Sequence, residues 1–401
     1  MGPLEFLLNL LLYLLGGYLL FNVGYLLFFS VLGHRRLPAL PAAPANSPLR
    51  RMCVLMPAYR ADAVIAATAP AAVAHAYAGP AHVQVIADGL RPATVHRLRE
   101  QGAGVLEVAF ERSTKGKALL AALNALPPHA HDVAVILDVD NEMAPGFLTQ
   151  INQAFAAGYQ VVQGHRTAKN LDSPFAVLDA CNEEINNHIF RQGHASLGLS
   201  AALIGSGMAF EYDYLHRLLR TIGDTPGEDK ELDFRTLQDG IKIAYLPTAY
   251  VFDEKIPNAR VFANQRTRWL ATQQEFLSKY FVEGLRQLGR GNVDFADKIG
   301  QSLLLPRVLL LGLLGGLLGL RLLGAAGPPA GFWLVLLAGT VGALLLALPA
   351  RLYTWQVGKA ALHLPVALGA MLRALLQIRQ AKKSFMPTPH APAGNSSPDL
   401  Q

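Results

Sequence analysis

The sequence predicts an α/β domain with a mostly parallel, doubly wound sheet, flanked by transmembrane α-helices. Between residues 50 and 275, short apolar segments alternate with helical ones, which is typical of a parallel sheet covered by helices on both faces. Hydrophobic residues make up 52% of the 401-residue chain, a high share for a protein that lies wholly in water. Part of the chain is therefore expected to lie in a membrane.

Residues 1–33 predict an N-terminal membrane anchor. The run from Leu4 to Leu32 is almost wholly apolar. At about 1.5 Å per residue it is long enough to cross a hydrocarbon core of about 30 Å. A cleaved signal peptide is the alternative, but no basic residue precedes the run, which is also too long for the apolar part of a signal. Residues 34–49, rich in Pro and Ala, predict a linker.

Residues 50–275 are expected to form the globular domain. The predicted strands are 52–57, 83–88, 105–110, 133–138 and 159–164. The predicted helices are 62–77, 92–101, 116–126, 145–157 and 173–193. Ligands bind outside the carboxyl ends of the strands in such sheets, so the side chains that follow these strands are the first candidates for a site.

The C-terminal third predicts further membrane segments. After an amphipathic connection over residues 276–300, two transmembrane helices are expected within residues 301–350. The apolar segment 360–378 is interrupted by polar residues and Pro365, which favours a helix lying on the membrane within residues 351–386, with a fourth span as the alternative. Residues 387–401 predict a disordered tail.

Basic residues that flank the predicted spans predict the topology. They are Arg35, Arg36, Arg50, Arg51, Lys298, Arg351 and Lys359. The positive-inside rule places them in the cytoplasm, so we predict a multi-pass protein of the cell inner membrane with residues 50–300 in the cytoplasm. These residues largely explain the net charge of +6. The sequence has no basic stripe interleaved with aromatic residues, and we expect no nucleic-acid partner.

Three carboxylates follow predicted strands. Asp88 ends one strand, and Asp138 and Asp140 end another. Carboxylates at positions i and i+2 leaving a strand can bind one hard cation, and Mg²⁺ and Mn²⁺ prefer such oxygen ligands and often complete their shell with phosphate oxygens. For an isolated Asp-x-Asp, a solvated loop or a helix N-cap is the alternative. The chain has neither a Gly-rich dinucleotide motif nor a P-loop.

Two segments place charged residues at probable helix starts. Lys115 and Lys117 suit an anionic group there, or are simply exposed lysines of an amphipathic helix. Glu228 and Asp229 follow a Pro-Gly turn, where a carboxylate could accept a proton from a hydroxyl nucleophile. Alternatively, they are acidic residues favoured in the first turn of any helix.

A third segment combines cations with an aromatic ring. In "NQRTRWLATQQEF", Trp269 could stack on a sugar and Arg268 could hold a diphosphate by a charge-assisted fork. A basic amphipathic helix on the membrane surface is the alternative, and the two interpretations are compatible.

In this combination the sequence resembles the membrane-bound family 2 glycosyltransferases with a GT-A fold, which include cellulose, hyaluronan and chitin-oligosaccharide synthases and related glycolipid-forming enzymes. "VLMPAYRAD" resembles the family's opening strand, with Tyr59 in the base-stacking place, and "VIADG" supplies Asp88 at the uracil end of the nucleotide. "KGKALLAALNAL" resembles its lysine-bearing helix, which makes Lys117 a nucleotide-binding candidate. "DVD" resembles its DxD motif, with Asp140 the more direct metal ligand and Asp138 also contacting the nucleotide.

Three later motifs extend the resemblance. "GSGMAF", residues 205–210, is similar to the loop beside the acceptor. "GED" is similar to the family's TED, in which the aspartate, here Asp229, is the catalytic base. "QRTRW" fits Q-x-x-R-W, which implies that Gln265, Arg268 and Trp269 line the acceptor and diphosphate site.

The resemblance implies inverting transfer of a sugar from a nucleotide-diphosphate sugar, UDP-linked, to a hydroxyl of a glycan or lipid-linked acceptor at the membrane. The cofactor would be Mg²⁺ or Mn²⁺ bound by Asp138 and Asp140. The product would be an exopolysaccharide or a cell-envelope glycan. Partner subunits of a biosynthetic complex are a further expectation. One alternative is a single-addition enzyme with a ceramide- or diacylglycerol-type acceptor. The other is a non-catalytic, membrane-anchored nucleotide-binding scaffold subunit, which the full set of carboxylates disfavours.

Overall fold

The computed structural model describes residues 2–381 apart from 43, 45–46, 224, 226 and 256–258, and apart from the side chains of 259–264, 374 and 376–381. The chain divides into two compact units. The helical unit comprises the described residues of 1–38, 171–199 and 255–386. The sheet unit comprises the described residues of 39–170 and 200–254. The predicted tail, 387–401, lies outside the described residues.

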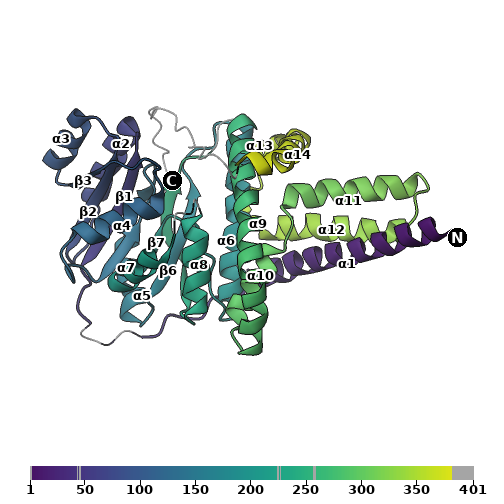
Figure 1. Cartoon of the computed structure of the whole chain (residues 1–401), viewed down its shortest axis with the longest axis horizontal. Helices are drawn as coiled ribbons and strands as arrows, with labels where there is room; N and C mark the ends of the chain where they lie inside the picture. The colour runs from purple at the N-terminus through teal and green to yellow at the C-terminus, as the bar shows by residue number, and fades with distance from the viewer. Residues whose placement is uncertain are drawn as a thin grey trace. The chain divides into compact units, whose positions relative to one another are not determined.

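The sheet unit is built on one sheet of eight described strands in the order β3-β2-β1-β4-β7-β6-β8-β5 (Figure 1). The strands are β1 Met52–Tyr59, β2 Ala81–Asp88, β3 Gly104–Val108, β4 Val133–Ile136, β5 Glu142–Met143, β6 Val161–Ala168, β7 Met208–Glu211 and β8 Ile243–Asp253. Its helices are α2 Asp62–Val73, α3 Pro92–Glu100, α4 Lys115–Ala125, α5 Phe147–Ala156, α7 Tyr212–Thr221 and α8 Glu228–Gln238.

The predicted α/β class is confirmed, and the sheet is mixed rather than parallel throughout. β1 pairs in parallel with β2 and β4, and β2 pairs in parallel with β3. β7 runs antiparallel to β4 and β6, while β8 is parallel to β6 and antiparallel to β5. All five predicted strands are present, whereas β5, β7 and β8 were not predicted.

The core lies around the central strands β1 and β4. Both are buried at nearly every position, as strands covered on both faces must be. Val54 and Val135 are register partners with no exposed surface, and they pack in one apolar cluster with Ile65 of α2 and Ile151 of α5. Burying each such side chain stabilises the fold by about 2 kcal/mol. This core fixes the carboxyl ends of β1, β2 and β4 at one edge of the sheet.

The helical unit contains the predicted membrane segments. Its elements are α1 Pro3–Leu32, α6 Pro174–Asn187, the π-helix η1 His188–Gly193, α9 Ala259–Gly289, α10 Val293–Ser302, α11 Arg307–Leu322, α12 Ala330–Ala347, the short η2 Ala350–Leu352, α13 Trp355–Ala361 and α14 Leu364–Ala381. In Figure 1, α1, α11 and α12 lie alongside one another, and α6 and α9 run across their direction. The predicted helix 173–193 thus corresponds to α6 and η1, which belong to this unit.

Among the described residues, α1 and α12 are each long and apolar enough to cross a membrane. A third span exists only if α10 and α11, which meet at a bend of 56°, count as one. The segment 360–378 covers the end of α13 and most of α14, with His363 between the two helices. The apolar segments expected from sequence are therefore helices, and their topology in a membrane stays a prediction.

Candidate active site

Three of the predicted carboxylates lie at one edge of the sheet. β2, β1 and β4 are adjacent and parallel, and Tyr59 and Asp88 are register partners at the ends of their strands. β4 ends at Ile136, so Asp138 and Asp140 follow directly at the same edge. The sheet therefore gathers these side chains, as expected from the rule that carboxyl ends of parallel strands meet.

Asp88 carries a buried carboxylate oxygen without a hydrogen-bond partner among the described residues. The residue is 7% exposed, and it is the Oδ2 atom that lacks a partner. Leaving such a buried acceptor unsatisfied costs about 1–3 kcal/mol, which a bound N–H or O–H donor would remove. Beside it, Tyr59 is 38% exposed, with the Arg60 guanidinium carbon 5.1 Å from its ring centroid. A ring and an unsatisfied acceptor side by side suit a planar ligand with a polar edge.

Lys115 links the metal-binding candidate Asp138 to the glycine loop before β7. Lys115 is the first residue of α4, whose N-cap Thr114 accepts a hydrogen bond from the Lys117 amide at 3.4 Å. The Lys115 ammonium donates to Asp138 Oδ1, and to the Gly205 carbonyl at 2.6 Å. Burial lowers the pKa of Lys115, but the negative charges of Asp138, Glu228 and Asp229 outweigh it and raise this pKa overall. Lys115 therefore stays a cation within this group of carboxylates.

Lys117, the lysine predicted to bind nucleotide, lies differently. Its ammonium donates to the Arg112 carbonyl at 3.1 Å, at an exposed position. Its binding role stays a prediction, whereas Lys115 is the lysine in direct contact with a predicted site carboxylate.

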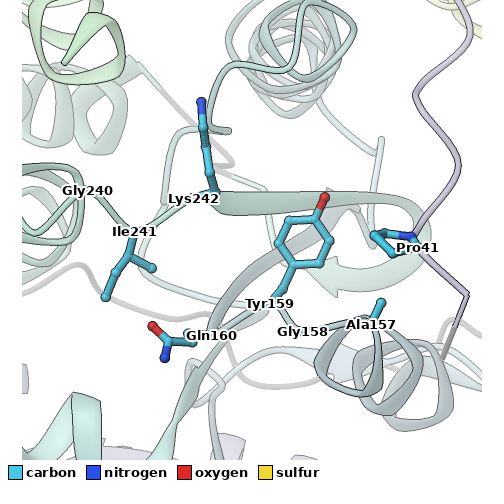
Figure 2. A pocket seen from close by; sticks show the side chains of 8 residues that line it. All are labelled: Pro41, Ala157, Gly158, Tyr159, Gln160, Gly240, Ile241 and Lys242. Atoms are coloured by element: carbon cyan, nitrogen blue, oxygen red, sulfur yellow. The ribbon is translucent and has the colours of Figure 1, made fainter. Parts of the chain in front are cut away.

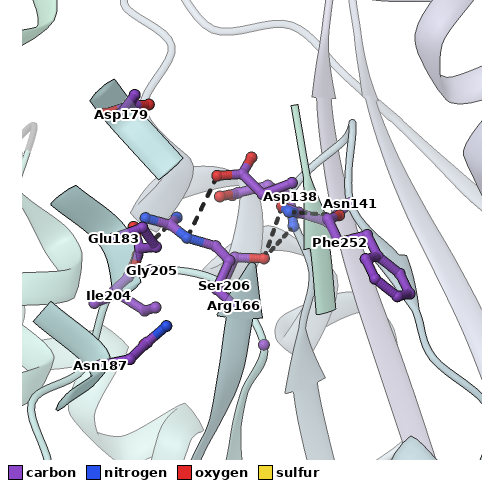
Figure 3. Close-up of polar contacts among 12 residues, drawn as sticks. Asp138, Asn141, Arg166, Asp179, Glu183, Asn187, Ile204, Gly205, Ser206 and Phe252 are labelled. Carbon is purple, nitrogen blue, oxygen red and sulfur yellow. Dashed lines mark hydrogen bonds and ion pairs between the residues drawn. The ribbon is translucent and has the colours of Figure 1, made fainter. Parts of the chain in front are cut away.

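The turn that carries Asp138 and Asp140 is held by buried polar residues that the sequence analysis did not identify. Figure 3 shows Ser206 and Asn141 beside Asp138. The Ser206 hydroxyl accepts from the Asp138 amide at 2.9 Å and donates to Asn141 Oδ1 at 3.0 Å. The Thr68 hydroxyl of α2 donates to the Val139 carbonyl at 2.6 Å. The carboxylates of Asp138 and Asp140 therefore project from a rigid backbone.

Asp229 faces the Lys115–Asp138 pair across Gly205. It is the second residue of α8, and Gly205 has a φ of +87°, a left-handed conformation that favours glycine. A Cβ atom built on Gly205 would lie 3.6 Å from Asp229 Oδ2 and 3.7 Å from Lys115 Nζ. Carboxylates that are 91 residues apart in the chain, Asp138 and Asp229, are thus brought around one lysine and one loop. The space at Gly205 is left free by the absence of a side chain.

Glu228, the first residue of α8, is a buried acid next to this group. It is 8% exposed, and burial raises its pKa from the ordinary 4.5 to about 7. The Lys115 ammonium opposes this rise, and the Asp229 carboxylate adds to it. The folded protein therefore keeps a proton on Glu228 at pH values where the unfolded chain has lost it.

We expect Glu228→Gln to change the pH dependence of stability. The pKa of Glu228 is higher in the folded protein than in the unfolded chain, so its proton stabilises the folded state. This contribution to the free energy of unfolding is complete below about pH 4.5 and is lost as pH rises through about 7. The variant, which cannot ionise, should match the parent near pH 4.5 and exceed it above pH 7. Thermal unfolding in detergent without nucleotide, from pH 4.5 to 8, measures this, with exposed Glu107→Gln as the control. Parallel curves for parent and Glu228→Gln would contradict the prediction.

A second charged pair at the same edge was missed by the sequence analysis. Arg166 of β6 lies 3.4 Å from the Asp253 carboxylate of β8, measured from Nε to Oδ2, with side chains 12% and 16% exposed. Its Nη1 donates to the Ile204 carbonyl at 3.4 Å, and Figure 3 shows the arginine beside the Ile204–Ser206 loop. The predicted strand 159–164 stopped short of Arg166, and β8 was not predicted. The pair adds a cation close to the loop that carries Gly205.

Gln265, Arg268 and Trp269 lie on α9, in the helical unit. Trp269 is 37% exposed, Gln265 and Arg268 are partly buried, and Gln265 Oε1 has no hydrogen-bond partner among the described residues. Their part in a common site with the carboxylates of the sheet unit stays a prediction.

The carboxylates fit a divalent cation that takes its other ligands from phosphate and water. Among the residues that the structure describes, no three Asp, Glu, His or Cys side chains form a metal-binding cluster. Asp138 and Asp140 supply hard oxygen ligands, and Mg²⁺ or Mn²⁺ is often held by one or two carboxylates together with substrate phosphates. The role of Asp140 as the more direct metal ligand stays a prediction.

A separate shallow pocket of about 300 Å³ lies where β6 and β8 begin (Figure 2). Its lining residues are Pro41, Ala157, Gly158, Tyr159, Gln160, Gly240, Ile241 and Lys242. None of them is a predicted site residue, and the pocket lies at the opposite ends of these strands from Arg166 and Asp253. It plays no part in the site described above.

Comparison with known proteins gives a family and a fold. A family model described as "Glycosyltransferase like family 2" matches residues 50–272. The mannosyltransferase PcManGT from Pyrobaculum calidifontis, solved with GDP-Man and Mn²⁺, is 16% identical, with a TM-score of 0.56 over 92% of this chain and 98% of that chain. This likeness shows the fold over nearly both whole chains and confirms the expected GT-A class.

A further solved structure matches part of the chain. Glucosyl-3-phosphoglycerate synthase from Mycobacterium tuberculosis, solved with Mn²⁺, UDP-Glc and phosphoglyceric acid, is 21% identical over 56% of this chain and 84% of that chain, with a TM-score of 0.37. Among curated proteins, no sequence matches.

Proposed function

The chain belongs to glycosyltransferase-like family 2, and from this premise we propose that it is an inverting enzyme that moves a sugar from a nucleotide-diphosphate sugar to an acceptor hydroxyl at a membrane. The observation that carries the proposal is the position of Asp229, which faces the Lys115–Asp138 pair across Gly205. A carboxylate positioned there can take a proton from an acceptor hydroxyl, while Lys115 and Asp138 on the other side of Gly205 hold the diphosphate of the donor.

Asp229 is the proposed general base. It takes the proton from the acceptor hydroxyl, and that oxygen attacks the anomeric carbon from the face opposite the nucleotide. The bond from the anomeric carbon to the diphosphate breaks, so the configuration inverts and the nucleoside diphosphate leaves. The Lys115 ammonium is an electrostatic neighbour of Asp229 in this group of charges.

The nucleotide end of the donor is proposed to lie at Asp88 and Tyr59. Asp88 Oδ2 would accept a hydrogen bond from the base, which satisfies this buried oxygen. Tyr59, more than a third exposed, would stack on the base. A uracil edge suits such an acceptor, which supports a UDP-linked donor.

The diphosphate is proposed to lie between Asp138, Asp140 and Lys115, with Gln265 and Arg268 as further candidates from α9. A bound Mg²⁺ or Mn²⁺ neutralises charge on the departing diphosphate. This chain's own contribution is to hold the two carboxylates on the turn fixed by Ser206 and Thr68, and to supply the Lys115 cation. Preorganised charges of this kind account for much of the rate of such transfers.

The acceptor is proposed to be a glycan or a lipid-linked molecule reached at the membrane surface. The helical unit contains α1 and α12, long and apolar enough to span a membrane. Its α13 and α14 expose large apolar side chains, among them Trp355 at 77%, Val366 at 53% and Leu372 at 50%. An amphipathic pair with such a face suits the boundary between headgroups and acyl chains.

The exposed face of α14 gives a test of this acceptor site. We expect Val366→Glu together with Leu372→Glu to reduce transfer to a lipid acceptor by at least about tenfold, because carboxylates weaken insertion of this face into the membrane. Transfer to a soluble acceptor should survive. Leu49→Glu, at a 45% exposed leucine of the sheet unit, is the matched control. Equal losses with both acceptors would contradict a membrane-surface role for α14.

The experiment that tests the function uses membranes that contain the full chain. They are incubated with a panel of radiolabelled nucleotide sugars that includes UDP-glucose and GDP-mannose, the donors bound by the two similar structures, with Mg²⁺ or Mn²⁺. Lipid-soluble and polymeric products are then separated, which identifies donor, acceptor class and the number of additions together. Absence of transfer from every donor would favour the non-catalytic scaffold subunit instead.

Single addition to a lipid-linked acceptor is the alternative form of this activity, and the separation of products distinguishes it from processive synthesis. Processive synthesis with export needs a membrane channel as well, and polymeric product in the assay would decide for it. A partner subunit could supply such a channel in a biosynthetic complex at the inner membrane.

A further inference from the structure

The polar face of α6 holds two arginines of neighbouring helices in the helical unit. Asp179, Asn182 and Asn186 follow each other at helical spacing. Asp179 Oδ1 accepts from Arg266 Nη2 of α9 at 2.6 Å. Arg307, at the start of α11, donates to Asn182 and, at 2.8 Å, to Asn186 Oδ1. The Asp179–Arg266 ion pair is a charged link between α6 and the segment that carries Trp269.

Arg266 also lies over the indole of Trp269. Its guanidinium carbon is 4.3 Å from the ring centroid, within the range of a cation–π contact. The two residues are three positions apart on α9, and Leu270 in the next position packs against an apolar cluster that includes Phe175 of α6 and Met371 of α14. One side of α9 is therefore fixed, with Arg266 between α6 and the indole.

The Asp179–Arg266 pair is almost fully enclosed, with side chains 10% and 9% exposed, whereas Trp269 keeps 37% of its surface exposed. A buried guanidinium needs a compensating charge. Arg307, a second cation, is an electrostatic neighbour of Arg266. Removing Asp179 would take away this ion pair and weaken the hold on Arg266 beside the indole.

We propose that Asp179 is a positioning residue for the acceptor: through Arg266 it fixes the ring of Trp269, which is the surface on which the acceptor binds. This rests on the proposed function for the acceptor, but the contact from Asp179 through Arg266 to Trp269 stands independently of it. Neither Asp179 nor Arg266 is one of the defining residues of the Q-x-x-R-W pattern. The two residues extend the acceptor site from α9 to α6.

The ring position can be measured directly, because the chain has three tryptophans. In a Trp333→Phe, Trp355→Phe background, Trp269 is the single fluorophore. We expect Asp179→Asn and Arg266→Lys each to raise acrylamide quenching of Trp269 by about twofold, because the planar guanidinium is then no longer held over the indole ring. Asp179→Glu should restore most of the parent signal. Glu184→Gln is the matched control, since Glu184 lies on the same helix and pairs with Arg351 at 2.6 Å.

The kinetic readout separates positioning from a general loss of structure. The KM for the acceptor should rise about tenfold in Asp179→Asn and Arg266→Lys, while kcat and the donor KM change less than about twofold.

Circular dichroism in detergent verifies that each variant is folded, and if Asp179→Asn is not, Arg266→Lys carries the test. Unchanged quenching in a folded variant would overturn the proposal, and so would changed quenching with an unchanged acceptor KM. If the parent transfers no sugar at all, the proposed function fails, while the quenching measurement still decides whether Asp179 holds the indole.

Discussion

Asp229→Asn should abolish sugar transfer while leaving nucleotide binding nearly intact. An amide cannot accept the proton of the acceptor hydroxyl, and loss of a general base lowers the rate by about 10²–10⁴-fold. Asn preserves the shape of the Asp229 side chain. That shape matters because the side chain lies close to Gly205, where a Cβ atom built on the glycine would be 3.6 Å from Asp229 Oδ2. The Asp138–Lys115 contact does not involve Asp229 and should persist. The contacts that hold the donor-binding residues should therefore be kept.

Two measurements establish this result. Single-turnover transfer with saturating donor and acceptor gives the chemical rate, and isothermal titration with the nucleoside diphosphate and Mn²⁺ gives the affinity. Asp213→Asn is the control, since Asp213 is a 42% exposed carboxylate that pairs with His129 outside the site. Near-normal turnover in Asp229→Asn would remove Asp229 as the base. A matched loss of nucleotide affinity would instead make it part of the donor site.

The parallel half of the sheet could be predicted because its strands are continuous apolar runs. β1 and β4 are buried on both faces, so their sequences carry no alternation and no polar interruption. β7 could not be predicted in the same way, since it has four residues and follows Gly205 and Gly207, both at positive φ, which makes the segment resemble a loop. β8 contains Pro247, and its pairing with β6 shifts register after Gly164, so neither its length nor its pattern is regular.

The candidate site was predictable to the extent that it follows from strand ends. Asp88, Asp138 and Asp140 were expected at one edge because their strands were expected to be parallel, and the structure places them there. Contacts made by side chains of unpredicted strands could not be anticipated. Arg166 and Asp253 meet through the pairing of β6 with β8, and Ser206 reaches the turn after β4 from the loop before β7. Packing of distant segments, rather than local pattern, determines these contacts.

The two lysines of α4 are equivalent in sequence and different in the structure. Lys115 and Lys117 both lie in the first turn, but successive helical residues point in directions about 100° apart, so residues two positions apart do not share a face. The Lys115 ammonium contacts Asp138 and the Gly205 carbonyl, whereas that of Lys117 donates to the Arg112 carbonyl. The sequence resemblance favours Lys117 as the nucleotide-binding lysine, and the contacts favour Lys115.

Lys115→Met should therefore lower kcat/KM by about 10²–10³-fold, the range expected when one preorganised charge is removed from such a site. Asp138, Glu228 and Asp229 would lose the cation that they share, and the pKa of Glu228, which Lys115 lowers, should rise further. Lys117→Met should cost less than about tenfold, as expected for a partly exposed lysine that contacts a backbone carbonyl rather than a site carboxylate. Steady-state kinetics with varied donor compare the two variants.

Lys115→Arg, which keeps the charge, should retain more activity than Lys115→Met if charge rather than packing is the cause. A larger rise in donor KM for Lys117→Met than for Lys115→Met would reverse the assignment and place the diphosphate on the outer side of α4, away from the Asp138 carboxylate.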